Sequence, residues 1–410
     1  MKTKHNQIDR RQFIKTITAA GVGSVFASTP LRAKDEKTKA GAKDEETALP
    51  QVPKRTLGKT GVKVPCLSLG SSAGEDPILL RKALDWGVNY WDTSYVAAGG
   101  NSELGIGKFI AQNPRLRKEL FIVTKESESR SADDLEARLQ KSLERLQTDY
   151  IDLYIGVYMM NRPEQLTDEL RQWAEGAKKK GKIHYLGVTT HRNMQDCLKA
   201  AAACGWVDAV MTAYNFRLMQ DEEMNKAMDA CAKAGVGIVT MKTQAFGQEA
   251  ESDKEKEFME HFLKKGYTEG QSKIKAVLTD ERISSVCSTM RDIAMLTENV
   301  AAALDKTSLS QQDMDFLSEY ARSTCSGYCA GCGDICNSAV PKTPYVSDIM
   351  RYLMYSRHYG RQDEARALFA QIPRDIRDRL LTTDYRSAEK QCPQSLPIAK
   401  MVAEAVSRLA

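Results

Sequence analysis

Three features are missing from this sequence of 410 residues. No apolar run approaches the roughly 20 residues that cross a bilayer core, no collagen-type glycine repeat occurs, and glycine and proline are too few for a low-complexity chain. With 42% hydrophobic and 28% charged residues, the composition is that of a folded protein. The length suits one large domain with an appendage, and we expect no stable membrane span in the mature form.

A charged surface for nucleic acid is also missing. The formal net charge is +5, and the first 33 residues account for all of it, because they contain six basic residues and one acidic residue. The rest of the chain is therefore neutral. Since nucleic acids and anionic membranes bind clustered basic surfaces, we expect neither as a partner.

Residues 1–33 have the features of a twin-arginine signal peptide. Arg10 and Arg11 are followed, after Gln12, by Phe13 and then by an uncharged stretch, residues 16–31, that is short and polar for a span of the bilayer core. An uncleaved membrane anchor is the lesser alternative. The twin-arginine export machinery is thus an expected partner, and the expected location is periplasmic or otherwise extracytoplasmic. Because this route carries folded proteins, it favours a cofactor inserted before export. Residues 34–53 are rich in Lys, Asp, Glu and Ala and predict a solvated linker.

Short apolar runs alternate with longer amphipathic stretches across residues 54–305. This alternation predicts strand–helix units and a parallel sheet, and eight units in about 250 residues match an α/β fold of the (β/α)8 TIM barrel type. An open doubly wound sheet is the alternative, but the first strand lacks the Gly-x-Gly-x-x-Gly turn of a dinucleotide-binding half. The expected strands are 66–70, 88–92, 120–125, 150–157, 183–188, 209–213, 236–241 and 284–287.

Six sequence blocks in a fixed order give the chain a resemblance to the aldo/keto reductase superfamily. They are RTLGKTG at 55–61, DT at 92–93, SELG at 102–105, TK at 124–125, DYIDLY at 149–154 and GKI at 181–183. The resemblance covers about residues 54–303. It implies a barrel that reduces carbonyl groups with NADPH at the carboxyl ends of its strands.

The resemblance also implies a catalytic tetrad. In this family a Tyr donates a proton, a Lys paired with an Asp lowers the pKa of that Tyr, and a His orients the carbonyl. Asp92 and Lys125 match the Asp and Lys positions, so we assign them as catalytic candidates. A purely structural ion pair is the alternative, because unpaired charges at the ends of apolar strands are costly.

The other two tetrad positions hold residues that cannot do this chemistry. Ala97 stands where the family has its Tyr, and Val157 where it has its His. Tyr95 is a candidate substitute acid, although it lies two residues before the expected position. Tyr158, the other candidate substitute, follows Val157, and strand alternation predicts that it points to the opposite face. We therefore expect a degenerate tetrad.

The resemblance marks further positions for an NADP(H) cofactor. Tyr214 and Asn215 match residues at the nicotinamide ring, and Thr189 stands where the carboxamide is commonly held. The residues that match the adenosine end follow the last strand and are Arg291, Glu298 and Asn299. An arginine there suits a 2′-phosphate. The alternative for each is an ordinary helix residue, so nucleotide binding stays open at this point.

Half of the ten cysteines lie in residues 306–410, which we expect to form a small, mostly helical domain. Cys329, Cys332 and Cys336 have Cys-x2-Cys-x3-Cys spacing, and Cys392 is followed by proline. This arrangement is close to that of ferredoxin-like proteins and predicts these four cysteines as ligands of one [4Fe-4S] cluster. A subgroup of aldo/keto reductase-like proteins carries a similar C-terminal segment.

Three other interpretations of the cysteines stay open. Zinc more commonly uses paired Cys-x2-Cys knuckles, and cysteines as close as those of residues 325–336 are awkward to join as disulfides. Cys325, with the next two cysteines, also fits the Cys-x3-Cys-x2-Cys pattern of radical SAM barrels, but that motif follows the first strand of such barrels. The remaining cysteines are expected to be small buried hydrophobes: Cys66, Cys197, Cys204, Cys231 and Cys287.

Three functions compete on these observations. The first is an exported iron–sulfur oxidoreductase that passes electrons between the cluster and a small-molecule substrate or a redox partner protein. The second is an NADP(H)-dependent carbonyl reductase with a substitute acid such as Tyr95. The third is a non-catalytic barrel that acts as a binding or scaffold protein. Free nicotinamide cofactor is not expected outside the cytoplasm, which favours the first.

Overall fold

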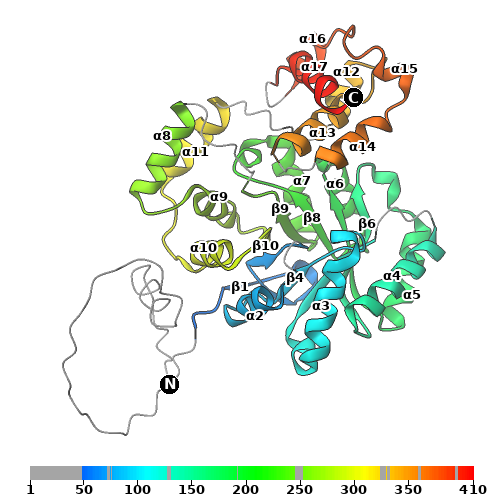
Figure 1. Ribbon diagram of the computed structural model, residues 1–410, viewed down its shortest axis with the longest axis vertical. Coiled ribbons are helices and arrows are strands. Elements are labelled where there is room, and N and C mark those ends of the chain that lie inside the picture. The colour runs from blue at the N-terminus through cyan, green and yellow to red at the C-terminus, as the bar shows by residue number, and fades with distance from the viewer. Residues whose placement is uncertain are drawn as a thin grey trace.

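A closed barrel of eight parallel strands forms the centre of the protein (Figure 1). The computed structural model describes residues 49–71, 74, 76–126, 131–191, 193–244, 253–323, 329, 333–358, 362–392 and 396–410. The strands are β3 (Leu67–Leu69), β4 (Tyr90–Asp92), β5 (Phe121–Lys125), β6 (Ile151–Met160), β7 (Ile183–Thr190), β8 (Ala209–Ala213), β9 (Gly237–Met241) and β10 (Ile283–Ser288). Each expected strand overlaps one of them, so the predicted (β/α)8 fold is confirmed.

The strands are apolar on both faces because both faces are covered. Inward side chains such as Val123, Ile155 and Val239 fill the barrel, while outward ones such as Ile122 and Ile238 pack in the larger cluster beneath the helices. A hairpin of β1 (Lys54–Thr56) and β2 (Lys63–Pro65) precedes the barrel and was not expected. Its residues Leu57 and Val64 join the inner cluster.

Helices follow the strands and surround them. Several begin at a side chain that caps the first turn, as Ser131, Thr167 and Asp221 do by accepting backbone N–H groups. The helices of this layer are α2 (Pro77–Asp85), α3 (Asn101–Gln112), α4 (Ala132–Leu146), α5 (Asp168–Lys179), α6 (Met194–Cys204), α7 (Glu222–Lys233), α8 (Asp253–Lys264), α9 (Glu269–Leu278) and α10 (Ile293–Leu304). Within the described residues, no helix combines the length and apolar character needed to cross a membrane.

The C-terminal helices gather at one end of the molecule (Figure 1). Helix α13 is central to this group and packs against α12, α14 and α17 through side chains such as Leu353, Phe369 and Val402. Helix α11 instead packs against α8. The helices are α11 (Gln311–Ser323), α12 (Gly333–Ala339), α13 (Val346–His358), α14 (Gln362–Ala370), α15 (Arg374–Arg377), α16 (Arg386–Gln391) and α17 (Ile398–Leu409).

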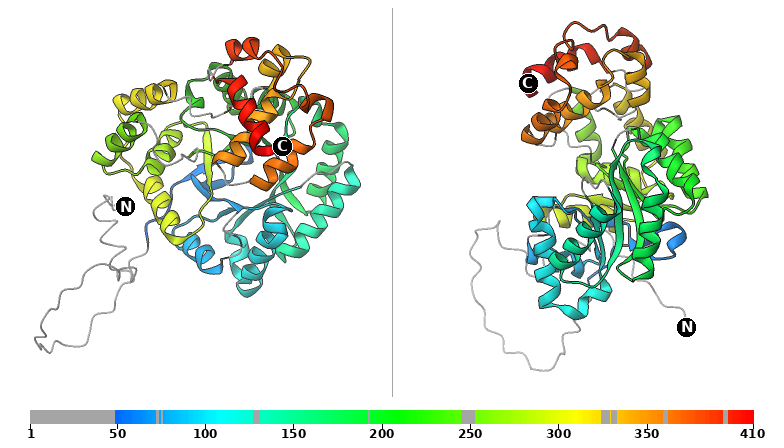
Figure 2. Two further views of the ribbon diagram at one scale, coloured as in Figure 1. Left: turned by 45° about the horizontal axis from the view of Figure 1, so that its top comes forward. Right: turned by 90° about the vertical axis from the view of Figure 1, so that its right-hand side faces the viewer.

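These helices lie over the carboxyl ends of the barrel strands, which we call the mouth (Figure 2). Lys242 directly follows β9, and its ammonium group lies 4.7 Å from the ring centre of Tyr355 on α13. Beyond β8, Phe216 stacks on Tyr320 of α11 with ring centres 6.0 Å apart. The C-terminal segment therefore covers the β8–β9 side of the mouth.

A buried arginine joins two strands at the opposite end of the barrel. Arg117, just before β5, donates to Asp152 Oδ2 at 2.9 Å and to the Tyr150 carbonyl at 2.8 Å. The same Asp152 oxygen accepts the Ile122 N–H at 2.9 Å. Thus Asp152, within one of the family-like blocks, holds the amino ends of β5 and β6 together.

Replacing this arginine should destabilise the barrel. We expect Arg117→Met to lower the free energy of unfolding by about 2 kcal/mol, because the Asp152 carboxylate is left buried without its cation. Arg115→Met is the matched control, since Arg115 lies on the same turn and is exposed. Urea unfolding measures both variants, and equal effects would contradict a role for the buried pair.

Candidate active site at the barrel mouth

Asp92 and Lys125 form an ion pair inside the mouth. Asp92 ends β4 and Lys125 ends β5, and Lys125 Nζ lies 2.5 Å from Asp92 Oδ1. The same ammonium donates to the Thr93 carbonyl at 2.7 Å. Each charged side chain is only 7% exposed. The pairing expected from the sequence is therefore present, and it places a buried cation where the strands end.

Cys287 adds a thiol to this pair. It faces the barrel interior from β10, and its side chain hydrogen-bonds to Asp92. Burial raises the pKa of Asp92, and the opposing effects of Lys125 and of the Cys287 hydrogen bond are smaller. Burial likewise raises the pKa of the Cys287 thiol far above its usual value. Cys287 is therefore a polar neighbour of Asp92 as well as a packing residue. Its position near the end of the last strand could have indicated this role from the sequence.

A hydrogen-bond framework behind the pair holds the ends of β4 and β5. Thr93 Oγ1 donates to Ser102 Oγ at 2.8 Å, and Thr124 Oγ1 donates to Glu103 Oε1 at 2.6 Å. The Glu103 carboxylate is fully buried and paired with Arg145 at 3.1 Å. The SELG block is thus structural here, since it orients the strand ends that carry Asp92 and Lys125.

Tyr95 lies in the loop after β4, on the side of helix α4. Its ring centre is 5.0 Å from the guanidinium carbon of Arg138 and 4.6 Å from that of Arg145. Arg145 also donates to the Tyr95 carbonyl at 2.8 Å. Ala97 begins a short 3-10 turn in the same loop and is half-buried. For Tyr95 to act as a substitute acid, its ring would have to leave both arginines.

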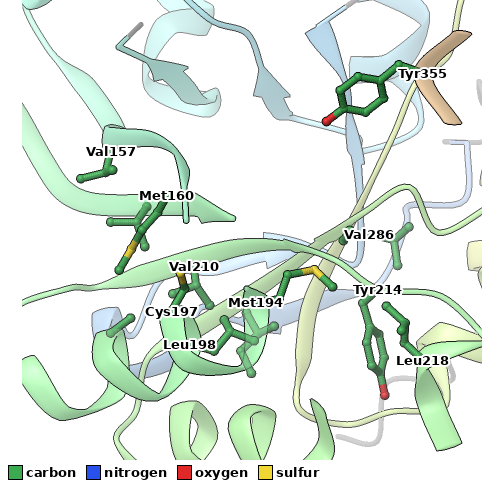
Figure 3. Close-up of a cluster of buried hydrophobic side chains, with 14 of the residues drawn as sticks. Val157, Met160, Met194, Cys197, Leu198, Val210, Tyr214, Leu218, Val286 and Tyr355 are labelled. Carbon is green, nitrogen blue, oxygen red and sulfur yellow. The ribbon is translucent and has the colours of Figure 1, made fainter. Parts of the chain in front are cut away.

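Strand β6 changes face before it ends. Ile155 pairs with Gly187 on β7, and a side chain on Gly187 would meet Ile155 inside the barrel. The next pair is Val157 with Val188, so Gly156 is an extra residue, which is a β-bulge. Val157 therefore faces outward and joins the cluster of buried side chains on α6 (Figure 3). The position matched to the family's His does not face the mouth.

Tyr158 lies on the face of β6 opposite Val157, as strand alternation predicts, but because the bulge has turned Val157 outward, that face is the one toward the mouth. Its backbone N–H donates to Glu126 Oε1 at 3.0 Å, and the Met159 N–H donates to Thr189 Oγ1 at 2.8 Å. The Tyr158 ring lies edge-on to the ring of His191, which directly follows β7, with ring centres 6.4 Å apart.

Comparison with known proteins agrees with this fold. Residues 72–311 match the model of the aldo/keto reductase family. The chain belongs to the aldo/keto reductase family. A curated relative, L-galactose dehydrogenase from Arabidopsis thaliana, is 26% identical over 295 residues, which are 65% of this chain and 92% of the relative. The barrel is therefore of a family of oxidoreductases. The region that matches the family model ends before the cysteine segment.

Two solved aldo-keto reductases have the same barrel. The holo form of an enzyme from Bacillus halodurans superposes with a TM-score of 0.54 at 23% identity, covering 67% of this chain and 98% of that one, and shows the fold alone. A thermostable aldo-keto reductase in complex with the inhibitor epalrestat gives a TM-score of 0.55 at 26% identity, covering 65% of this chain and 99% of that one.

Tyr214, matched by resemblance to the aldo/keto reductase nicotinamide site, has its ring inside the protein. Its backbone N–H donates to the Met241 carbonyl at the mouth, at 3.1 Å, but its hydroxyl donates to Asp280 Oδ2 at 3.0 Å. Asp280 precedes β10, so the hydroxyl lies toward the amino end of that strand. Burial raises the pKa of this phenol. In this conformation the ring runs along the outside of the barrel.

Two other positions matched to the nicotinamide end support loops of the aldo/keto reductase barrel. Asn215 is fully buried, donates to the Lys242 carbonyl at 3.4 Å and accepts the Arg217 N–H at 3.1 Å. Thr189 is also fully buried, and its hydroxyl accepts the Met159 N–H described above. Both residues thus shape the mouth through the backbone.

The positions matched to the adenosine end lie on and just before α10. Arg291 is exposed, and the Glu298 carbonyl accepts from Gln271 Nε2 at 3.0 Å. Asn299 is buried and bonds to Gln244 at 3.0 Å and to Ser288 at 3.1 Å. Gln244 in turn accepts from Ser288 Oγ at 3.0 Å, which closes a ring of three polar side chains. The sequence did not predict Gln244, which follows β9 without a recognisable motif.

Three of the four predicted cluster ligands are neighbours. Cys336 on α12 and Cys329 are buried, and Cys392 is half-buried at the end of α16, which packs against α12. Burial raises the pKa of Cys336 to about 12, and the nearby thiols of Cys329 and Cys392 contribute to that shift. Cys332 lies outside the described residues. Thiol donors brought together from distant positions fit the chemistry of an iron–sulfur or zinc site.

The described thiols do not complete a metal site by themselves. Within the described part of the chain, no three Cys, His, Asp or Glu side chains are grouped closely enough to hold a metal ion. No disulfide joins any two of the eight described cysteines. The three thiols are therefore adjacent in the fold without forming a complete coordination sphere, and the ligand assignment stays a prediction.

A buried arginine contacts this cysteine segment. Arg351 on α13 is fully buried, and its Nη1 donates to the Cys329 carbonyl at 2.9 Å. Its guanidinium carbon lies 5.7 Å from the ring centre of Tyr355, one helical turn further along. Sequence reasoning missed Arg351, because a single arginine within an amphipathic helix carries no signal of burial.

Proposed function

We propose that this protein is an exported iron–sulfur oxidoreductase of the aldo/keto reductase family. One [4Fe-4S] cluster, held by Cys329, Cys332, Cys336 and Cys392, would exchange electrons with a small molecule or a redox partner protein. The observation that carries this proposal is that the thiols of Cys329 and Cys392 both lie near enough to Cys336 to raise its pKa. When bound, such a cluster supplies one-electron transfer.

Helix α13 supports a connection between the cysteine segment and the mouth. Arg351 contacts the Cys329 carbonyl, and Tyr355, four residues later on the same helix face, contacts Lys242 at the end of β9. Residues four apart in a helix are direct neighbours. Helix α13 thus joins the backbone of one predicted ligand to the barrel mouth within one helical turn, which supports electron transfer between the two.

The tetrad substitutions support electron transfer over conventional carbonyl reduction. Asp92 and Lys125 keep the buried pair, but Ala97 and Val157 offer neither a proton nor a hydrogen bond. Export by the twin-arginine route, to the periplasm or another extracytoplasmic space, is part of the same proposal. The leader that supports it, residues 1–33, lies outside the described residues.

Metal and sulfide analysis of anaerobically purified protein tests this function. We expect a broad absorption band near 400 nm that dithionite bleaches, with about four irons per chain, as a four-cysteine [4Fe-4S] site requires. Zinc in place of iron would contradict the redox function. A colourless, metal-free protein would favour the scaffold function, because the barrel also lacks half of its tetrad.

NADP(H)-dependent carbonyl reduction is the second candidate. It is favoured by the Asp92–Lys125 pair and by the Asn299 polar ring close to the positions matched to the adenosine end. Fluorescence of NADPH on titration with the protein tests this function directly. A dissociation constant for NADPH below millimolar, and smaller than that for NADH, would support this function. No binding at millimolar NADPH would dismiss it.

A further inference from the structure

The ends of β5, β6 and β7 carry a cluster of acid–base side chains outside the tetrad positions. Glu126 follows β5, Tyr158 lies near the end of β6, and His191 follows β7. Glu126 is 5% exposed and His191 is 7% exposed, while Tyr158 is half-buried. Because neighbouring parallel strands end at the same edge, these residues share the part of the mouth next to Asp92 and Lys125.

Side chains from both neighbouring strand ends hold the backbone at Tyr158. Two side-chain acceptors from the flanking strands, Glu126 Oε1 and Thr189 Oγ1, bind the consecutive N–H groups of Tyr158 and Met159. Met159 has a φ of 59°, a left-handed conformation that is uncommon outside glycine. Bulges of this kind often lie beside active sites, where they re-aim a side chain. Here the bulge turns Val157 outward and Tyr158 toward the mouth.

We propose that Tyr158 and His191 replace the Tyr and His that are absent at Ala97 and Val157. They would bind the carbonyl or hydroxyl oxygen of a small-molecule substrate, with Tyr158 as the proton donor and His191 as a hydrogen-bond donor to the same oxygen. This inference rests on the carbonyl reductase function given above as the second candidate. Glu126 is a positioning residue, because it acts through the Tyr158 backbone.

The reaction balances with one reduced nicotinamide nucleotide. Its hydride forms a new bond to the carbonyl carbon, and the π electrons of the C=O bond move to the oxygen. That oxygen takes the proton of the Tyr158 hydroxyl and becomes an alcohol, while the nicotinamide is oxidised. The phenolate then regains a proton from water. A phenol with a pKa near 10 needs a cation nearby for this role, and Lys125 ends the strand beside β6.

The chain contains a matched control for this pair. Tyr150 directly precedes β6 and His184 lies on β7, both at the opposite end of the barrel, with ring centres 4.6 Å apart. The test is NADPH-dependent reduction of 4-nitrobenzaldehyde by the full chain. We expect Tyr158→Phe to lower kcat about 100-fold or more with little change in KM, as loss of a general acid does. His191→Gln should lower kcat/KM about tenfold, and Tyr150→Phe and His184→Gln should behave as the unchanged protein.

Each outcome decides the inference. Activity that survives Tyr158→Phe, or falls equally in Tyr150→Phe, would overturn it. If the unchanged protein binds NADPH but reduces no aldehyde, the inference fails while nucleotide binding stands. If it binds no NADPH, the carbonyl reductase function fails as well. Circular dichroism of Tyr158→Phe separates lost chemistry from lost folding, and Glu126→Gln should weaken activity less, because the amide oxygen still accepts the Tyr158 N–H.

Discussion

Replacing Cys336 with serine is expected to remove nearly all iron from the protein. Cys336 is a predicted ligand on α12. The nearby thiols of Cys329 and Cys392 both help to raise its pKa. A serine hydroxyl is a poor substitute for a thiolate, because iron–sulfur clusters are held by thiolate sulfur. Iron and acid-labile sulfide per chain, measured after anaerobic purification, should fall from about four to below one.

Cys231→Ser is the matched control for this experiment. Cys231 is also buried, in α7, with a pKa raised by burial to about 12, and its thiol donates to the Leu198 carbonyl at 3.3 Å. It should therefore show a similar packing cost without loss of iron. Full iron content in Cys336→Ser would remove Cys336 from the ligand set. Loss of iron in both variants would indicate a general folding defect.

Replacing Lys125 with methionine should destabilise the barrel by about 3 to 5 kcal/mol near pH 8, because a buried carboxylate is left without its cation. In the variant the pKa of Asp92, already raised by burial, should rise further, since Lys125 is the main opposing influence. The folded state then binds a proton that the unfolded state has released. Stability should fall with rising pH by about 1.4 kcal/mol per unit between the unfolded pKa near 3.9 and the raised pKa of Asp92 in the folded variant.

Urea unfolding at pH 5, 6, 7 and 8 measures this effect against the unchanged protein. The double variant Asp92→Asn with Lys125→Met removes the buried charge at every pH. It should therefore lose the extra pH dependence while keeping part of the packing cost. A Lys125→Met variant whose stability deficit is the same at all four pH values would show that Asp92 is not the titrating group.

Periodicity located the barrel strands because burial on both faces leaves an apolar run that few other structures produce. The range 209–213 agrees at both ends with β8, and the range 183–188 agrees with the first residue of β7. Such elements are specified locally. The β1–β2 hairpin escaped prediction, because its strands have three residues each and show too little alternation to read.

The site was less predictable because side-chain direction depends on neighbouring strands. Asp92 and Lys125 could be paired from sequence, since both end strands that are adjacent in the chain. The direction of the Val157 side chain could not be predicted from sequence, because the bulge at Gly156 depends on the register with β7. Nor could sequence show that the Tyr214 hydroxyl reaches Asp280. The resemblance to the family therefore identified which residues to examine, but not the direction in which their side chains point.

The helices over the mouth are synthesised after the barrel. During translation the barrel can form before α13 and α17 have left the ribosome, since domains generally fold from the N-terminus onward. Until then the strand ends beside Lys242 are open, and afterwards Tyr355 lies over them. The order of synthesis thus gives a bulky ligand a period of access to the β8–β9 side of the barrel that the completed protein no longer offers.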